Sequence, residues 1–242
     1  SMMVRSTLRD LSASLSRLQV TQTRLSTGKQ LTKASDDPTS TATAMNLRRQ
    51  MERATQRARS LDDAQGWLGA ADAALTSGLD LLARAKEIAV RAANTGGIGD
   101  VNARGALAAQ IRSIRDDMLG LANSTYIGRS IFAGTSAGNA YDANGTYRGN
   151  TASILRDVAP KITLGINTVG PAAFGVGGGA VGNVIEVLYR LATAIANGDS
   201  AGITAEHVNL DAATATLGAA TVEIGSRAAL LDEIRARASD DE

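Results

Sequence analysis

The chain has 242 residues with a net charge of +1, a single histidine, His207, and no cysteine. This composition excludes a disulfide-stapled scaffold, a zinc ribbon and a thiol nucleophile, and a catalytic triad would need His207 for all of its proton transfer. Hydrophobic residues are 44% of the chain but aromatic residues only 3%, which is typical of long, closely packed helices. We therefore expect a protein that is not an enzyme, with no catalytic residue, metal ligand or cofactor.

The charge is unevenly distributed along the chain. Residues 1–60 contain eleven Lys and Arg against four Asp and Glu, a net charge of +7, so the rest of the chain carries −6. The basic segment has no aromatic residue to stack on bases, which argues against nucleic-acid binding. No apolar run is long enough for a membrane span, so we expect no membrane partner. Five arginines are candidates for contacts with acidic faces of neighbouring subunits, with a merely solvated helix face as the alternative: Arg48, Arg49, Arg53, Arg57 and Arg59.

An amphipathic helix is predicted first, from about residue 7 to residue 27. Its apolar residues recur at alternating steps of three and four, as in the seam of a coiled coil, with Gln22 as a polar position. Gly28 is placed to end this helix, and Asp37 and Pro38 are placed to cap and open the next one. The seam consists of Leu8, Leu11, Leu15, Leu18 and Leu25.

A second, much longer helix is predicted from Pro38 to Asn94. A helix of this length extends about 85 Å at 1.5 Å per residue, more than the width of a compact globule of this size, which predicts an elongated rod. Asp100 is placed to cap a third helix that reaches about Phe132. The long helix carries four seam leucines spaced seven apart: Leu61, Leu68, Leu75 and Leu82.

The three-four spacing returns near the end of the sequence. His207 occupies one of the seam positions there, which favours a buried or half-buried spacer over a ligand. The main apolar positions of this seam are Leu210, Leu217, Ile224 and Leu231.

The chain changes character between these helices. Residues 134–180 contain ten of the 25 glycines and two of the three prolines. Ile162, Leu164 and Ile166 alternate as in a half-buried strand, and Asn144-Gly145, flanked by two tyrosines, predicts a hairpin turn. A short helix is predicted over residues 181–196.

These elements predict a mainly α fold, an elongated rod of long antiparallel coiled-coil-like helices with a small β-rich insertion. Residues 3–133 and 181–242 would form the helical rod domain, and residues 134–180 the glycine-rich insertion. Gly177, Gly179 and Gly182 match the spacing of a dinucleotide-binding loop, but the second parallel strand that such a site needs does not follow. We interpret these glycines as a flexible joint.

Several segments resemble, in order, the flagellin-like axial proteins of the bacterial flagellum. RLSTGK at 24–29 with SDDP at 35–38 is similar to the family's amino-terminal signature, and QGWL at 65–68 through IAVRAAN at 88–94 to its long core helix. IFAGT at 131–135, YD at 141–142, GTYRG at 145–149 and VEIGSR at 222–227 resemble the FlgL (hook-associated protein 3) branch more than flagellin. The resemblance covers nearly the whole chain.

The resemblance implies a rod of packed amino- and carboxyl-terminal helices with an outward β-rich domain, and no catalysis. It implies a structural subunit of the extracellular flagellum that forms the junction between hook and filament. The implied partners are a FlgK-type hook-associated protein, flagellin, further copies in a ring, and a chaperone of the flagellar type III export apparatus. Because family members continue past both ends, the terminal polymerisation segments look truncated, and we expect a monomer at micromolar concentration.

Two other functions fit parts of the sequence. A flagellin filament subunit would have the same architecture and is the nearest alternative. A helical sensory module such as a chemoreceptor ectodomain would need flanking membrane helices and a pocket of convergent polar groups, and the sequence indicates neither.

Overall fold

The computed structural model describes residues 2–27, 38–94, 100–179 and 181–240. Its elements are mostly helical, with two short antiparallel hairpins, and the chain divides into two compact units, Ser1–Gln56 and Arg57–Glu242. In order, the elements are α1 (Met2–Thr27), α2 (Pro38–Asn94), α3 (Val101–Ala122), β1 (Thr125–Tyr126), β2 (Arg129–Ser130), β3 (Leu155–Ala159), β4 (Ile162–Gly165), α4 (Gly170–Phe174), α5 (Val184–Asn197) and α6 (Ser200–Asp240).

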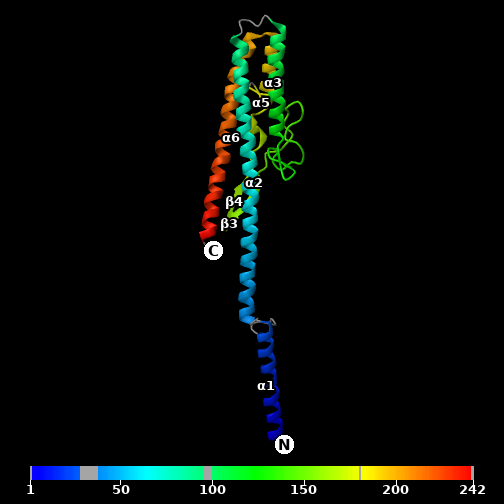
Figure 1. Cartoon of the computed structure of the whole chain (residues 1–242), viewed down its shortest axis with the longest axis vertical. Helices are drawn as coiled ribbons and strands as arrows, with labels where there is room; N and C mark the ends of the chain where they lie inside the picture. Colours follow the sequence, from blue (N-terminus) through cyan, green and yellow to red (C-terminus); the bar gives the residue numbers. More distant parts are fainter. Residues whose placement is uncertain (1, 28–37, 95–99, 180, 241–242) are drawn as a thin grey trace. The chain divides into compact units, whose positions relative to one another are not determined.

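The second unit is a bundle of long helices. The later part of α2, then α3, α5 and α6, run alternately up and down alongside one another (Figure 1). Gly78 allows close approach between α2 and α6, because a Cβ there would lie 2.9 Å from the Leu217 side chain. The heptad leucines of both helices are buried in one continuous core, as a seam of this period requires. These are Leu61, Leu68, Leu75 and Leu82 of α2, and Leu210, Leu217, Ile224 and Leu231 of α6.

The helix ends follow their local chemistry. Pro38 is the first residue of α2, and the predicted Asp100 cap is confirmed, since its side chain accepts a hydrogen bond from the Asn102 amide at 2.8 Å. The predicted caps at Gly28 and Asp37 lie outside the described residues. The prediction that the third helix reaches Phe132 is wrong: α3 ends at Ala122.

Asn123 explains why α3 stops early. Its side-chain amide donates to the Tyr141 carbonyl at 3.0 Å, and its side-chain oxygen accepts from the Tyr141 amide at 2.8 Å. Both hydrogen bonds require the chain to leave the helix and turn toward residue 141. The apolar residues that follow, Ile131 and Phe132, are buried in the core after the β1–β2 hairpin instead of on a helix face.

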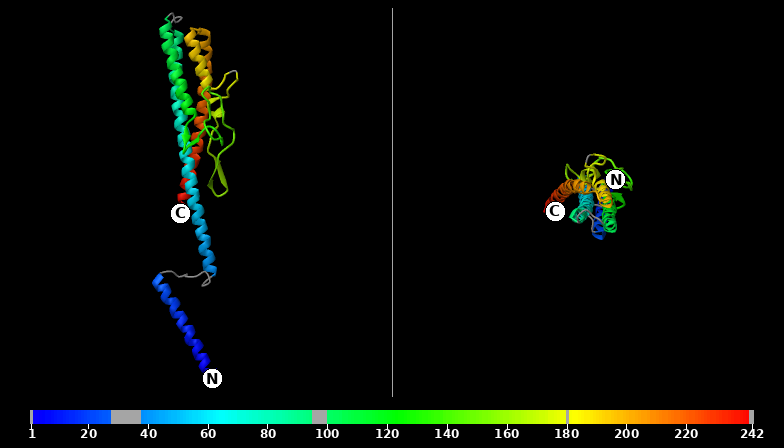
Figure 2. Two further views of the ribbon diagram at one scale, coloured as in Figure 1. Left: turned by 90° about the vertical axis from the view of Figure 1, so that its right-hand side faces the viewer. Right: turned by 90° about the horizontal axis from the view of Figure 1, so that it is seen from above.

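The segment between α3 and α5 holds two hairpins. β1 pairs with β2, and β3 with β4, each in an antiparallel two-stranded sheet. The predicted strand is confirmed as β4, but its half-buried alternation is not, because Ile162 is 47% exposed and Ile166 is buried just beyond the end of the strand. The predicted Asn144-Gly145 turn joins an isolated bridge between Tyr141 and Tyr147. These loops lie against the helices of the second unit (Figure 2).

Three side chains fix the turn around residue 143 to the helices. Besides Asn123, Arg115 of α3 donates to the Ala143 carbonyl, and buried Asn183, the cap of α5, donates to the Gly145 carbonyl at 2.8 Å. The glycine-rich segment is therefore held by side chains from α3 and from the start of α5.

Candidate interaction surface

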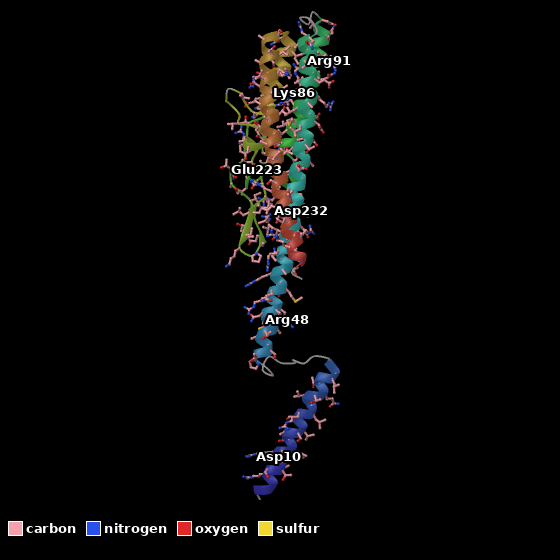
Figure 3. All side chains as sticks on the ribbon, turned by 90° about the vertical axis from the view of Figure 1, so that its left-hand side faces the viewer. Asp10, Arg48, Lys86, Arg91, Glu223 and Asp232 are labelled. Carbon is pink, nitrogen blue, oxygen red and sulfur yellow. The ribbon has the colours of Figure 1, made fainter. Side chains whose placement is uncertain are left out.

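The first unit exposes the apolar seam predicted for its amphipathic helix. All five seam leucines of α1 are between 57% and 80% exposed. On the first turns of α2, Leu47 and Met51 are also exposed, at 55% and 69%. Large apolar side chains left in solvent at coiled-coil spacing indicate an association surface. The side chains of α1 project from it on all sides in Figure 3.

The five candidate arginines all lie on α2, but they do not form one cluster. Arg49 and Arg53 are one helical turn apart on the first unit, where Arg49 donates to the Asn46 side chain at 2.6 Å. Arg57 and Arg59 belong to the second unit, where Arg57 is half-buried and Arg59 exposed. Arg48, labelled in Figure 3, is exposed on the first unit. The helical spacing thus places them on two ridges of α2.

Many carboxylates of the second unit are committed to ion pairs that hold its elements together. Lys86 of α2 pairs with Asp211 of α6 at 2.7 Å, which holds the pKa of that carboxyl below its usual range. Further along the same helices, Asp62 pairs with Arg235 at 2.9 Å. Arg156 of β3 reaches Asp63 at 2.7 Å and so ties the β3–β4 hairpin to α2.

The turn at residues 142–146 is stabilised by its own carboxylate. Asp142 accepts hydrogen bonds from the amides of Thr146 and Asn144 and pairs with Arg148 at 2.7 Å. These contacts, with the Thr146 amide first, lower the pKa of Asp142. Burial raises the pKa of neighbouring Tyr141 well above its ordinary value, so this phenol stays neutral and serves as core.

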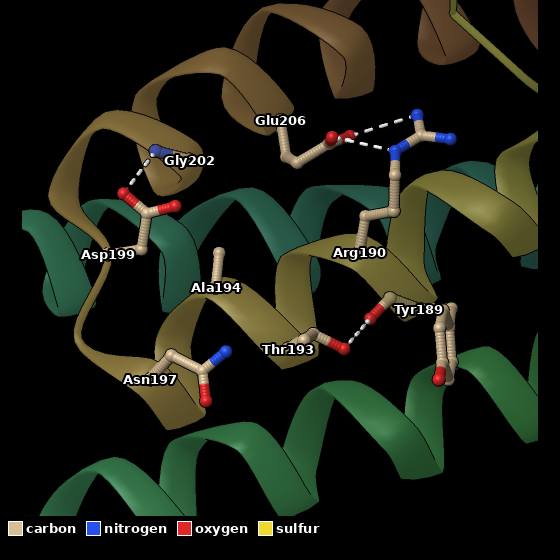
Figure 4. A pocket seen from close by; sticks show the side chains of 8 residues that line it. All are labelled: Tyr189, Arg190, Thr193, Ala194, Asn197, Asp199, Gly202 and Glu206. Carbon is tan, nitrogen blue, oxygen red and sulfur yellow. Dashed lines mark hydrogen bonds and ion pairs between the residues drawn. The ribbon is translucent and has the colours of Figure 1, made fainter.

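A small pocket lies between α5 and α6, with a volume of about 240 Å³ (Figure 4). Its charged groups are already engaged: Arg190 binds Glu206 through two hydrogen bonds of 2.7 and 3.1 Å, and Asp199 accepts from the Gly202 amide at 2.9 Å. Thr193 donates to the backbone oxygen of Tyr189. The pocket therefore holds helix-pairing contacts and no acid–base pair poised for catalysis.

The glycine loop at residues 177–182, whose spacing matches a dinucleotide-binding loop, is occupied by a carboxylate of the same chain. Glu186, in the first turn of α5, accepts hydrogen bonds from the amides of Gly178 and Asn183 at 3.2 Å each. A Cβ at Gly177 would lie 2.9 Å from the same carboxylate. The amides that would hold a phosphate at this helix N-terminus thus already bind an anion.

His207 is half-buried on α6, as its seam position predicts. Its Nδ1 atom is buried and has no hydrogen-bond partner. Among the described residues, no group of three His, Asp or Glu side chains could hold a metal ion, and no helix in those ranges is long and apolar enough to cross a membrane.

The β1–β2 hairpin lies where the apolar pattern of the sequence predicts a continued helix as far as Phe132. Tyr126 packs edge-on against Trp67 of α2 at 5.9 Å, and the Arg129 guanidinium lies over the same indole ring at 5.9 Å. Ile127 and Gly128 form the two-residue turn, both with positive φ. The sequence signal for this hairpin is the concentration of β-branched and aromatic residues from Thr125 to Ile131, interrupted by one glycine.

Comparison with known proteins gives a consistent set of relatives. The family model for the bacterial flagellin N-terminal helical region matches residues 1–137. Flagellar hook-associated protein 3 of Salmonella typhimurium is 33% identical over 154 residues, which are 62% of this chain and 48% of that protein. Flagellin B of Helicobacter pylori is 28% identical over 184 residues, 74% of this chain and 34% of that protein.

The fold is similar to a solved structure. The crystal structure of Bacillus cereus FlgL matches with a TM-score of 0.70 and 21% sequence identity, over 83% of this chain and 96% of that one. The chain spans about half the length of the Salmonella protein and a third of the Helicobacter flagellin.

Proposed function

This chain belongs to the bacterial flagellin family, and we propose that it is a structural subunit of the flagellum that forms the junction between the hook and the flagellin filament. The observation that carries the proposal is the exposed leucine seam of α1, which has coiled-coil spacing and faces solvent along its whole length. A seam of this kind stabilises a protein only when another helix covers it. The exposed seam of α1 therefore fits a subunit that packs against neighbouring subunits in an assembly.

The junction position is favoured over the filament because the similarity covers 48% of hook-associated protein 3 at 33% identity, whereas it covers 34% and 29% of two flagellin B proteins at 28% and 32% identity. Such a subunit contacts a FlgK-type protein on the hook side, flagellin on the filament side and further copies of itself in a ring. It reaches this extracellular position through the flagellar type III export apparatus with the help of a chaperone. A flagellin filament subunit is the alternative.

Different parts of the chain have different roles in this junction. Residues 3–133 with 181–242 supply the helical rod domain, and residues 134–180 an insertion presented outward. The exposed arginines of α2 contact acidic faces of adjacent subunits, with Arg49 and Arg53 spaced one turn apart for this purpose. Individual surface ion pairs contribute only about 0 to 1 kcal/mol each, so these contacts select partners more than they supply affinity.

The proposal is tested by deleting the gene in its source bacterium. We expect cells to keep their hooks, to secrete flagellin into the medium unpolymerised and to lose motility. Expression of the wild-type protein should restore the filament, whereas a variant with Arg48, Arg49 and Arg53 changed to Glu should restore less motility. Filaments that form normally without the protein would contradict the junction function.

A further inference from the structure

The sulfur atoms of this protein are all thioethers. The chain has five methionines and no cysteine, so methionine is the one side-chain type here that peroxides oxidise reversibly. The described methionine side chains differ sharply in exposure. Met45 and Met51 of α2 are 53% and 69% exposed, whereas Met118 of α3 is fully buried in the core. An oxidant in solvent therefore reaches the two methionines of α2 long before it reaches Met118.

The two exposed methionines lie on different faces of α2. Met51 belongs to an apolar stripe that runs at steps of three and four through Ala44, Leu47, Met51 and Ala54, the spacing that places side chains on one face of a helix. Leu47, one turn before Met51, is 55% exposed. Met45 lies six residues before Met51, about 120° away around the helix. Met51 is thus the exposed sulfur within the stripe, and Met45 is an exposed sulfur outside it.

From this placement we propose that Met51 is a reversible oxidation site through which hydrogen peroxide blocks assembly of the free subunit. In the reaction the O–O bond of the peroxide breaks and one oxygen atom forms a bond with the thioether sulfur. The sulfur loses two electrons to give the sulfoxide, and the peroxide is reduced to water. The inference rests on the proposed function, because it requires the exposed stripe of α2 to be covered in the flagellum.

Oxidation of Met51 changes the face that a neighbour would cover without disturbing the fold. The thioether is flexible and apolar, whereas the sulfoxide is polar and needs a hydrogen-bond partner when it is buried. In the free subunit both forms of the side chain remain in water. The backbone of Met51 stays in the helix, where its carbonyl also accepts a hydrogen bond from the Thr55 hydroxyl at 2.9 Å. The penalty therefore arises only when the stripe loses its water on association.

Reversibility distinguishes this site from damage. Methionine sulfoxide reductases return the sulfoxide to the thioether, so a subunit oxidised at Met51 regains its apolar face. Oxidation of buried Met118 would instead place a polar group in the packed core. Exposure on the stripe thus makes Met51 a position where oxidation affects association and leaves stability unchanged.

The first test measures selectivity on the purified protein, and its result does not depend on the proposed function. Hydrogen peroxide should oxidise Met45 and Met51 at least tenfold faster than Met118, with no change in melting temperature while Met118 remains intact. Trypsin separates the two sulfurs of α2 because Arg48 and Arg49 lie between them, so mass spectrometry reads each one. Equal oxidation rates at Met51 and Met118 would overturn the site.

The second test introduces polarity at each position in the deletion strain. Gln and Leu have helix propensities close to that of Met, so neither substitution should unfold α2. Met51→Gln should reduce motility several-fold relative to the wild-type protein, and Met51→Leu should restore most of that loss because it keeps the stripe apolar. Met45→Gln is the matched control on the other face and should leave motility unchanged. Wild-type motility with Met51→Gln would overturn the inference.

The third test asks whether assembly covers the sulfur. In isolated flagella, hydrogen peroxide should oxidise Met51 at least tenfold more slowly than in the free protein. The same rate in both states would overturn the inference, and the junction function would survive that result if the wild-type protein still restores filaments to the deletion strain. Filaments that form without the protein would instead remove the proposed function, while the selectivity measured on the purified protein would stand.

Discussion

At the scale of single residues, glycines on α2 show how the same residue type serves different purposes. A Cβ at Gly66 would overlap the hydroxyl of Tyr126, whereas a Cβ at Gly69 would meet nothing within 4 Å. Gly66 is therefore required by the approach of the β1–β2 hairpin. Gly69 only costs helix stability, by about 1 kcal/mol relative to Ala.

We predict opposite effects for the two glycine-to-alanine variants. Gly66→Ala should lower the free energy of unfolding by about 1 to 3 kcal/mol, because either Tyr126 or the helix must shift. Gly69→Ala should raise it by about 0.5 to 1 kcal/mol. Urea unfolding followed by circular dichroism measures both, and equal effects at the two positions would show that the hairpin does not pack against α2 as described.

At the scale of elements, identical leucine seams have different surroundings. Leu75 of α2 is fully buried in the bundle, while Leu15 of α1 is 57% exposed. Both occupy heptad positions in long helices. The spacing defines the apolar face of a helix, and the tertiary structure decides whether that face is covered within the subunit.

This difference predicts separable phenotypes. Leu75→Ala should lower the free energy of unfolding by about 2 to 5 kcal/mol, since it leaves a cavity in a packed core. Leu15→Ala should leave the stability of the isolated protein within about 0.5 kcal/mol, as for other surface substitutions, but should reduce assembly into flagella. Unfolding curves measure the first effect and motility the second. A large loss of stability with Leu15→Ala would mean that α1 is covered within the subunit.

At the scale of the whole molecule, stability and association use different surfaces. The bundle from Arg57 onward has its own continuous core, supported by ion pairs such as Lys86 with Asp211. The exposed α1 seam includes one polar position, Gln22, which weakens a helix pair formed by this seam alone. The two surfaces can therefore change independently.

We predict that the isolated protein is monomeric at micromolar concentration. One short seam supplies little affinity once the entropy of association is subtracted, so assembly needs several contacts at once. Light scattering measures the mass directly, and Leu15→Ala provides the matched control with a weakened seam. A stable oligomer of defined mass in the wild-type protein would contradict the prediction.

The helices and their apolar faces can be predicted from the residue pattern alone. Heptad spacing predicted the long helix from Pro38 to Asn94, its buried leucines and the half-buried position of His207, because periodicity depends only on neighbouring residues along one helix. The Asp100 cap was equally local.

Long-range contacts override the local pattern at several positions, and these positions become apparent only in the folded chain. Asn123 ends α3 by binding Tyr141, eighteen residues away, and Glu186 reaches back to fill the glycine loop. The strained exposure of Ile127 also became visible only once the hairpin was in place. These features depend on groups far apart in the sequence that meet in space, and helical periodicity carries no information about such meetings.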